Sequence, residues 1–167
     1  MPDSPRKPGP KAPLNFSPEL EKKVQLMKNI SFFKDFTEPE LFETAQLSSW
    51  LKFSTDDTIV REGDRGSSFW ILLKGSVRVV KTILDGKIIQ RTLTVIPQGE
   101  CFGEMSMISG ETRTADIVAN EEVFLYKIEG YVISQAKDSL QLKFYKRFSE
   151  ILVTRLARSS QMLAEQS

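Results

Sequence analysis

The sequence predicts a mainly β fold with α content, in which a double-stranded β-helix (jelly roll) is flanked by N-terminal helices and a long C-terminal helix. Three observations support this prediction. Short alternating segments broken by Gly and Asp run from residue 50 to residue 128, which is typical of an antiparallel sandwich or jelly roll. Helix-start signals precede this region, and an apolar side with helical spacing follows it. The length of 167 residues suits a single domain.

Residues 1–17 are expected to form a disordered, proline-rich leader. Six of the eight prolines lie between Pro2 and Pro18, interleaved with Gly9 and basic residues. Such a composition buries little apolar surface and favours extended or disordered states. A basic arm that docks on a partner is the alternative interpretation of this segment.

Residues 18–49 form the predicted N-terminal helical segment. Ser17 as N-cap and Pro18 at the first helical position begin a helix that we expect to run to about Asn29. Thr37 and Glu40 have the spacing of a capping box, so a second helix is expected to begin there.

The β-roll is predicted over residues 50–128. Its candidate strands are 51–54, 58–61, 68–74, 76–84, 87–96, 114–119 and 122–128. Asp85 and Gly86 separate two of the longest strands, and this dipeptide predicts a two-residue hairpin turn.

Residues 129–167 are predicted to form the C-terminal helices, including one long helix from about Asp138 to Ala164. Apolar residues follow one side of this helix, and we call them the apolar stripe: Leu140, Phe144, Phe148, Ile151, Leu152 and Leu156. The stripe could cover a ligand, pack on the β-roll or pair two copies of the chain. The sequence leaves these three alternatives open.

The composition excludes several classes of chemistry. The chain has no histidine, and Cys101 is its single cysteine, so a His general base, an imidazole zinc site, a His-ligated haem, an iron–sulfur cluster and an intramolecular disulfide are excluded. Lys and Arg number 23 against 22 Asp and Glu, which gives no electrostatic reason to bind nucleic acid or a membrane. No signal peptide is recognisable, and the cysteine count favours a cytoplasmic location.

The stretch from Phe102 to Ala115 carries the clearest chemistry in the sequence. Gly103 allows a ligand to approach the backbone closely. If residues 104–108 form a helical turn, their free amides favour an anion, and the guanidinium of Arg113 suits phosphate oxygens.

Two further side chains in this stretch suit a phosphorylated sugar. Glu104 is an acceptor for sugar hydroxyls, and Thr114 offers a hydroxyl group. The alternative interpretation is an ordinary ion pair between Glu104 and Arg113 on a loop, with Gly103 as a turn residue.

This stretch is similar to the phosphate-binding cassette of cyclic nucleotide-binding domains, whose pattern is approximately F-G-E-x-[AS]-L-x(4,5)-R-[AST]-A. Residues 59–79 resemble the other signature of this family, a Gly-Asp loop followed by an aromatic strand and a glycine turn. The two signatures occur in the correct order, and the resemblance covers roughly residues 32–156. Ser106-Met107 stands where Ala-Leu is commoner, and Thr112 stands where Pro is frequent. Neither departure removes a ligand-contacting group.

The resemblance implies a role for each matching residue. Arg113 would bind the cyclic phosphate, and Glu104 would accept a hydrogen bond from the ribose 2′-hydroxyl. Gly103 would supply a backbone contact to the sugar, the amides of residues 105 and 106 would lie near the phosphate, and Thr114 would contact phosphate or guanine. The implied ligand-binding residues are Phe102, Gly103, Glu104, Met105, Ser106, Arg113, Thr114 and Ala115.

Catabolite-activator-type regulators and regulatory subunits of protein kinase A resemble this chain. Few residues follow Ala164, so a DNA-reading module does not fit, and we expect a stand-alone, bacterial-type version. The resemblance implies a sensor of cAMP, with cGMP as the alternative ligand, that acts on an unknown downstream protein by repositioning its C-terminal helices. A homodimer through the long helix is a further expectation.

Two other function classes are alternatives to this sensor. One is a degenerate cyclic nucleotide-binding fold that acts as a protein-interaction scaffold without a ligand. The other is an enzyme such as a phosphodiesterase, which we do not expect because the sequence lacks a metal cluster and a general acid–base pair. We therefore expect no catalytic residues, no metal and no cofactor besides the nucleotide ligand.

Overall fold

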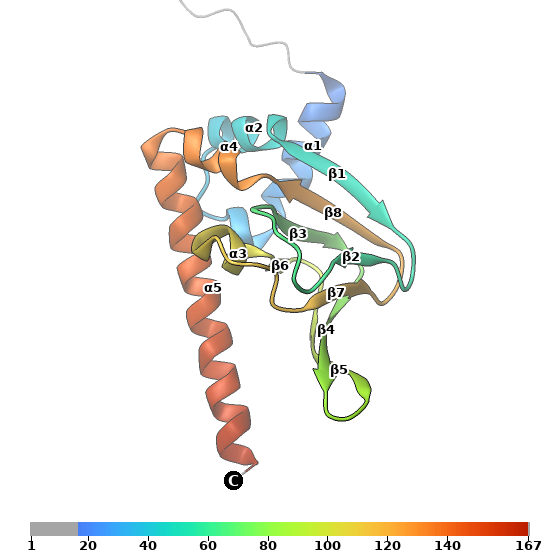
Figure 1. Ribbon diagram of the computed structural model, residues 1–167. Coiled ribbons are helices and arrows are strands. Elements are labelled where there is room, and N and C mark those ends of the chain that lie inside the picture. Colours follow the sequence, from blue (N-terminus) through green and yellow to red (C-terminus); the bar gives the residue numbers. More distant parts are fainter. Residues whose placement is uncertain (1–16, 167) are drawn as a thin grey trace, which may run out of the picture.

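Eight strands form two antiparallel sheets in the computed structural model, which describes residues 17–166 (Figure 1). One sheet has the order β1 (Ser48–Phe53), β8 (Val123–Ile128), β3 (Phe69–Lys74) and β6 (Cys101–Phe102). The other has the order β2 (Thr58–Val60), β7 (Asp116–Ala119), β4 (Val77–Leu84) and β5 (Ile88–Ile96). The predicted mainly β class and jelly-roll architecture are confirmed. The leader predicted at residues 1–17 lies outside the described residues, apart from Ser17.

Strand β3 contributes to two separate apolar cores. Phe69 and Ile71 belong to a core shared with the helices, whereas Trp70 and Leu72 belong to a core between the two sheets. Successive side chains of a strand point to opposite faces, so a strand that is apolar at every position is buried on both sides. This arrangement places the Trp70 ring against Gly103, the residue that follows β6.

The N-terminal segment forms helix α1 (Pro18–Lys28), the short 3₁₀ helix η1 (Ser31–Phe33) and helix α2 (Glu38–Gln46). Both predicted starts are confirmed: Ser17 caps α1, and the capping box of Thr37 and Glu40 begins α2. Strand β1 begins at Ser48 because Ser48 pairs with Ile128, so the predicted helical segment 18–49 extends two residues too far.

Phe32 of η1 anchors the N-terminal segment in the helix-side core. Only 2% of its surface is exposed. Its ring centroid lies between 5.1 and 6.1 Å from five other rings, those of Phe33, Phe36, Phe69, Phe144 and Phe148. This aromatic cluster ties η1, β3 and the C-terminal helix together.

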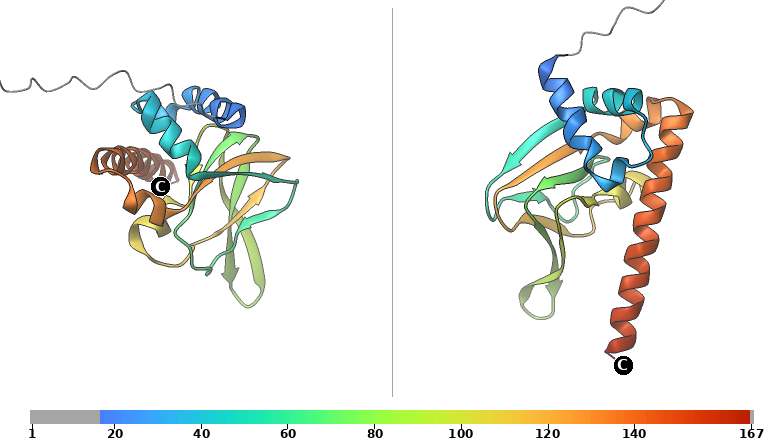
Figure 2. Two further views of the ribbon diagram at one scale, coloured as in Figure 1. Left: turned by 90° about the horizontal axis from the view of Figure 1, so that it is seen from above. Right: turned by 180° about the vertical axis from the view of Figure 1, so that it is seen from behind.

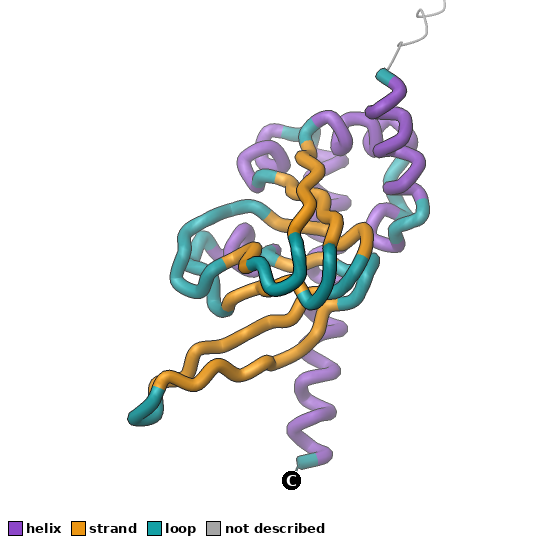
Figure 3. The backbone as a smooth tube through the Cα atoms, turned by 90° about the vertical axis from the view of Figure 1, so that its right-hand side faces the viewer, coloured by secondary structure: helices purple, strands orange, loops and turns teal. Residues whose placement is uncertain are grey.

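Strands β4 and β5 form a hairpin that projects away from the rest of the β-roll (Figure 3). Leu84 pairs with Ile88, so Asp85, Gly86 and Lys87 form a three-residue loop and the predicted two-residue turn is wrong. Gly86 has a φ of 65°, in the left-handed region that three-residue hairpin loops use.

The C-terminal part consists of helix α4 (Gly130–Gln135) and the 28-residue helix α5 (Asp138–Glu165). Helix α5 begins at the end of the molecule where α1, α2 and α4 lie, runs alongside the β-roll, and ends at the opposite end (Figures 1 and 2). Along the apolar stripe, Leu140, Phe144 and Phe148 are buried, whereas Leu156 is 68% exposed. The stripe therefore packs on the β-roll chiefly through its N-terminal half.

Within residues 17–166, none of the helices combines the length and apolar character that a transmembrane segment requires.

Candidate functional site

Gly103 turns the chain from strand β6 into the short helix α3 (Glu104–Ser109). Its φ of 88° is left-handed, and a Cβ atom at this position would lie 2.8 Å from the ring of Trp70. A glycine is therefore required here for both conformation and close approach. Helix α3 supplies the helical turn at residues 104–108 on which the expected anion site depends.

Arg113 lies beneath this turn, and only 6% of its surface is exposed. Its Nη1 donates to the carbonyl oxygen of Gly103 at 2.9 Å, and its Nη2 donates to the carbonyl oxygen of Ser68 at 2.7 Å. The guanidinium carbon lies 5.0 Å from the centre of the Trp70 ring. These contacts hold the cation in one orientation and leave further N–H groups of its five available to an anion.

The Gly-Asp loop between β2 and β3 positions the backbone of Arg113. The amide of Gly63 donates to the Arg113 carbonyl at 2.8 Å, and the Arg113 amide donates to the Asp64 carbonyl at 2.8 Å. Burial lowers the pKa of Arg113, and the charges of Glu129 and Glu104 oppose that effect. An arginine stays protonated in such surroundings, so the site retains a fixed positive charge.

Glu104 is almost completely buried, with 1% of its surface exposed. Its Oε1 accepts a hydrogen bond from Nη1 of Arg155 on α5 at 2.5 Å, whereas its Oε2 is buried and has no hydrogen-bond partner. An unpaired buried carboxylate oxygen is costly, so this atom is an acceptor that a ligand hydroxyl would satisfy. Among the described residues no salt bridge joins Glu104 to Arg113, so the alternative of an ordinary pair between them is wrong.

A cavity of about 120 Å³ brings the predicted site residues together. All eight line it: Phe102, Gly103, Glu104, Met105, Ser106, Arg113, Thr114 and Ala115. Val60, Val79 and Ile96 supply an apolar wall from the second sheet. A neighbouring cavity of about 220 Å³ shares Met105, Ser106 and Thr114 and reaches Leu152 on α5.

The eight residues differ in how they face the cavity. Phe102 is buried and stacks on Trp70, with ring centroids 5.3 Å apart, so it shapes the floor of the site. Ser106 and Ala115 are buried, whereas Met105 and Thr114 are exposed at the rim. A ligand would therefore meet polar groups at one end and apolar surface at the other.

Arg155 is a site residue that the sequence analysis missed, whereas Leu152 belongs to the apolar stripe, for which covering a ligand was one of the alternatives. Arg155 also donates a hydrogen bond to the carbonyl oxygen of Cys101, so it bridges α5 to β6 and to α3. The signal was its position four residues after Ile151 and three after Leu152, on the inward side of the helix. Cys101 itself is buried, and burial raises the pKa of its thiol, so it packs as an apolar residue.

Sequence comparisons match this chain to one family model and to a group of related kinases. A model described as the cyclic nucleotide-binding domain matches residues 50–137. Human cGMP-dependent protein kinase 2 is 33% identical over 95 residues, which cover 57% of this chain and 12% of the kinase. The cGMP-dependent protein kinase of Plasmodium berghei is 24% identical over 154 residues, which cover 86% of this chain and 17% of that kinase. The chain thus spans a small part of either kinase.

Solved structures are similar in fold. A cyclic nucleotide-binding domain from Methylobacillus flagellatus has a TM-score of 0.76 and 25% identity, covering 89% of this chain and 84% of that one. The regulatory domain of Toxoplasma gondii PKA, solved with cAMP, has a TM-score of 0.67 and 23% identity, covering 78% of this chain and 50% of that one. The second likeness bears on the fold alone.

Proposed function

The chain belongs to the cyclic nucleotide-binding domain family, and from this premise we propose that it binds cAMP or cGMP and signals by repositioning the C-terminal part of α5. The domain is a regulatory module, not a catalytic one. The observation that carries the proposal is the ion pair between Glu104 and Arg155, which joins the candidate ligand site to the C-terminal helix.

The site is complementary to a cyclic nucleotide at both ends. Arg113 presents a buried, fixed guanidinium of the kind that binds phosphate oxygens. Glu104 Oε2 is a buried acceptor without a partner, which suits a ribose hydroxyl. The apolar wall at Val60, Val79 and Ile96 offers surface for a purine base.

Helix α5 occupies part of this site. The cavity of about 120 Å³ is smaller than ordinary ligand pockets, which hold about 300 Å³ or more, and Arg155 forms one of its walls. A nucleotide whose ribose hydroxyl reaches Glu104 Oε2 would need the space that Arg155 occupies in this cavity, so its binding would displace Arg155 and open the site. The ligand then has different affinities for two positions of α5, which is the requirement for a switch.

The N-terminal part of α5 is attached much more firmly than the part that carries Arg155. Lys143 binds Glu40 of α2 at 2.5 Å, and Arg147 donates to the carbonyl oxygens of Phe32 and Ser31 at 2.9 and 3.1 Å. Beyond Leu152 the apolar side chains of the helix are exposed. We therefore place the moving part of α5 after Leu152.

The direct test is isothermal titration of cAMP and cGMP into protein that has been unfolded, freed of nucleotide and refolded. We expect saturable binding, and Arg113→Ala should weaken it about tenfold to a hundredfold because charge-assisted hydrogen bonds to the phosphate are lost. Arg113→Lys keeps the charge and separates lost geometry from lost charge, and circular dichroism shows whether each variant folds. Absence of heat with both nucleotides in folded wild-type protein would favour the ligand-free scaffold instead.

The same titration decides between the two bases. The sequence slightly favours cAMP, while the two kinases described above are named for cGMP, and the Thr114 hydroxyl suits either purine. We propose that the signal passes to a partner protein or a second copy of the chain through the exposed end of α5, where Leu156 and Met162 are 68% and 60% exposed. A cytoplasmic location is part of the same proposal.

A further inference from the structure

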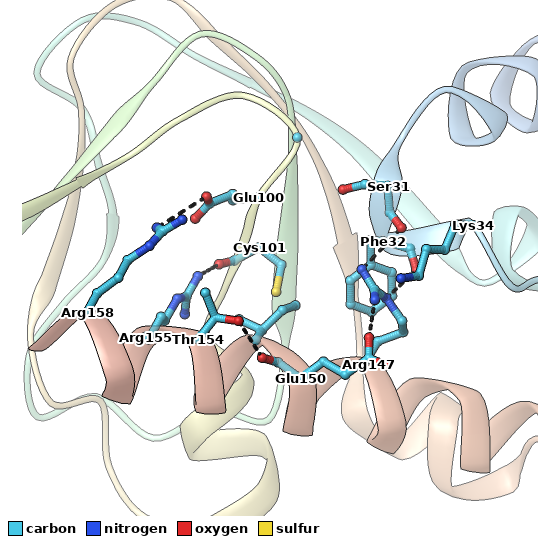
Figure 4. Close-up of a pocket in the computed structure, with 12 residues that line it drawn as sticks. Ser31, Phe32, Lys34, Glu100, Cys101, Arg147, Glu150, Thr154, Arg155 and Arg158 are labelled. Carbon is cyan, nitrogen blue, oxygen red and sulfur yellow. Dashed lines mark hydrogen bonds and ion pairs between the residues drawn. The ribbon is translucent and has the colours of Figure 1, made fainter. Parts of the chain in front are cut away.

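A second and larger cavity lies between α5, the helix η1 and the turn that leads into β6 (Figure 4). Its volume is about 330 Å³, within the range of small-molecule pockets and well above that of the cassette cavity. Half of its lining residues come from α5. We infer that this cavity binds a small multivalent anion that carries phosphate or carboxylate groups, at a second site that shares only Arg155 with the nucleotide site.

The charge of the lining favours an anion. Four basic side chains line the cavity, those of Lys34, Arg147, Arg155 and Arg158, against two acidic ones, Glu100 and Glu150. Even when Glu104, the partner of Arg155, is counted, the basic groups exceed the acidic ones. Lys34 is exposed, and its ammonium group has no hydrogen-bond or ion-pair partner in the described part of the chain.

Arg147 gives the cavity a fixed, buried cation. Only 9% of its surface is exposed, and its guanidinium is held by the carbonyl oxygens of Phe32 and Ser31 and by the carboxylate of Glu150 (Figure 4). Three acceptors leave part of its five-donor capacity unused. A guanidinium already fixed in this way loses little conformational entropy when it binds an anion.

The ion pair between Arg158 and Glu100, at the rim of the cavity, is weak. Its charged atoms lie 3.8 Å apart, and the two side chains are 63% and 37% exposed. Exposed pairs of this kind contribute little to stability, so an anion can replace Glu100 as the partner of Arg158 at small cost. Together with Lys34 on the opposite side, Arg158 would enclose the anion.

Separate titrations of inorganic pyrophosphate and of citrate into the Arg113→Ala protein test this inference, because that variant lacks the phosphate-binding arginine of the cassette. We expect one of the two probes to bind saturably at one site. The double variant Lys34→Gln/Arg158→Gln in the same background should weaken binding about tenfold or more, since both residues are exposed and their loss spares the fold. The control Lys87→Gln/Lys146→Gln removes two exposed charges elsewhere and should bind as the parent does.

Three results would overturn the inference. The first combines two observations: neither probe binds the Arg113→Ala protein, and a probe binds wild type with an affinity that the Lys34/Arg158 substitutions leave unchanged. That combination would place the anion at Arg113. The second is an equal loss in the double variant and in its control, which would indicate a general charge effect. The third is no binding of either probe to any folded protein of the series.

Discussion

Arg155 of α5 and Glu104 of α3 form an ion pair within the candidate nucleotide site, with Nη1 and Oε1 2.5 Å apart. The carboxylate is buried, and the arginine side chain is 30% exposed. The contact therefore couples the position of the C-terminal helix to the state of one carboxylate. In the proposed mechanism, a ligand that displaces Arg155 from this carboxylate releases the C-terminal part of the helix.

Arg155→Gln is expected to raise the affinity for the cyclic nucleotide about three- to tenfold, because the ligand no longer has to break the ion pair that holds Arg155 in the cavity, and a partly exposed ion pair contributes about 1 kcal/mol. The same change should lower the free energy of unfolding by about 1–2 kcal/mol, because Glu104 loses its partner. Titration calorimetry and urea unfolding measure the two effects. Lys146→Gln removes an exposed charge from the same helix and serves as the control. A weaker affinity in Arg155→Gln would mean that Arg155 orients Glu104 for the ligand and does not compete with it.

Gly103→Ala is expected to lower the free energy of unfolding by about 3 kcal/mol or more. A left-handed φ of 88° costs an alanine about 1–2 kcal/mol, and the new methyl group would lie 2.8 Å from the Trp70 ring. Gly99→Ala is the matched control, because Gly99 has a φ of 87° and a methyl group added there would meet no atom within 4 Å. Urea unfolding of both variants isolates the contact with Trp70. Equal losses in the two would show that the Trp70 contact adds nothing.

Glu40→Gln is expected to remove a pH-dependent part of the stability. Burial acts to raise the pKa of Glu40, but hydrogen bonds from Lys143 and from the Thr37 amide outweigh it and hold the pKa below its usual value of 4.5. A carboxyl group with a lowered pKa in the folded state stabilises the fold above that usual value, and the contribution is lost as the pH falls through the folded pKa.

The difference in unfolding free energy between wild type and Glu40→Gln should therefore be about 1 kcal/mol at neutral pH and should shrink below pH 4.5. Denaturant unfolding across this range, with Glu43→Gln on the same helix as the control, measures it. A difference that stays constant with pH would show that the charge of Glu40 contributes nothing.

Local signals in the sequence were sufficient for much of the fold. The cap at Ser17, the capping box at Thr37 and the apolar stripe of α5 depend on neighbours within one or two turns, and each appears where it was predicted. The start of β1 was missed because its pairing with Ile128 involves a strand 80 residues away. Strand β6 has two residues, too few to leave an alternating pattern.

The candidate site likewise has a part that the sequence predicts and a part that it does not. The residues of the cassette lie within 14 positions of the chain, so their motif could be read directly, and all eight line one cavity. Arg155 lies 51 residues beyond Glu104, and only the packing of α5 brings the two together. An interaction of that range depends on how a helix packs, which its own sequence pattern does not specify.

The most direct test of the account is hydrogen exchange of α5 with and without saturating cyclic nucleotide. We predict that exchange changes in the cassette at residues 102–115 and in α5 after Leu152, while α1 and α2 keep their protection. The Arg113→Ala variant, treated with the same nucleotide concentration, should show no such change. Equal protection of residues 140–163 in the free and the nucleotide-saturated protein would contradict the proposed role of the Glu104–Arg155 pair.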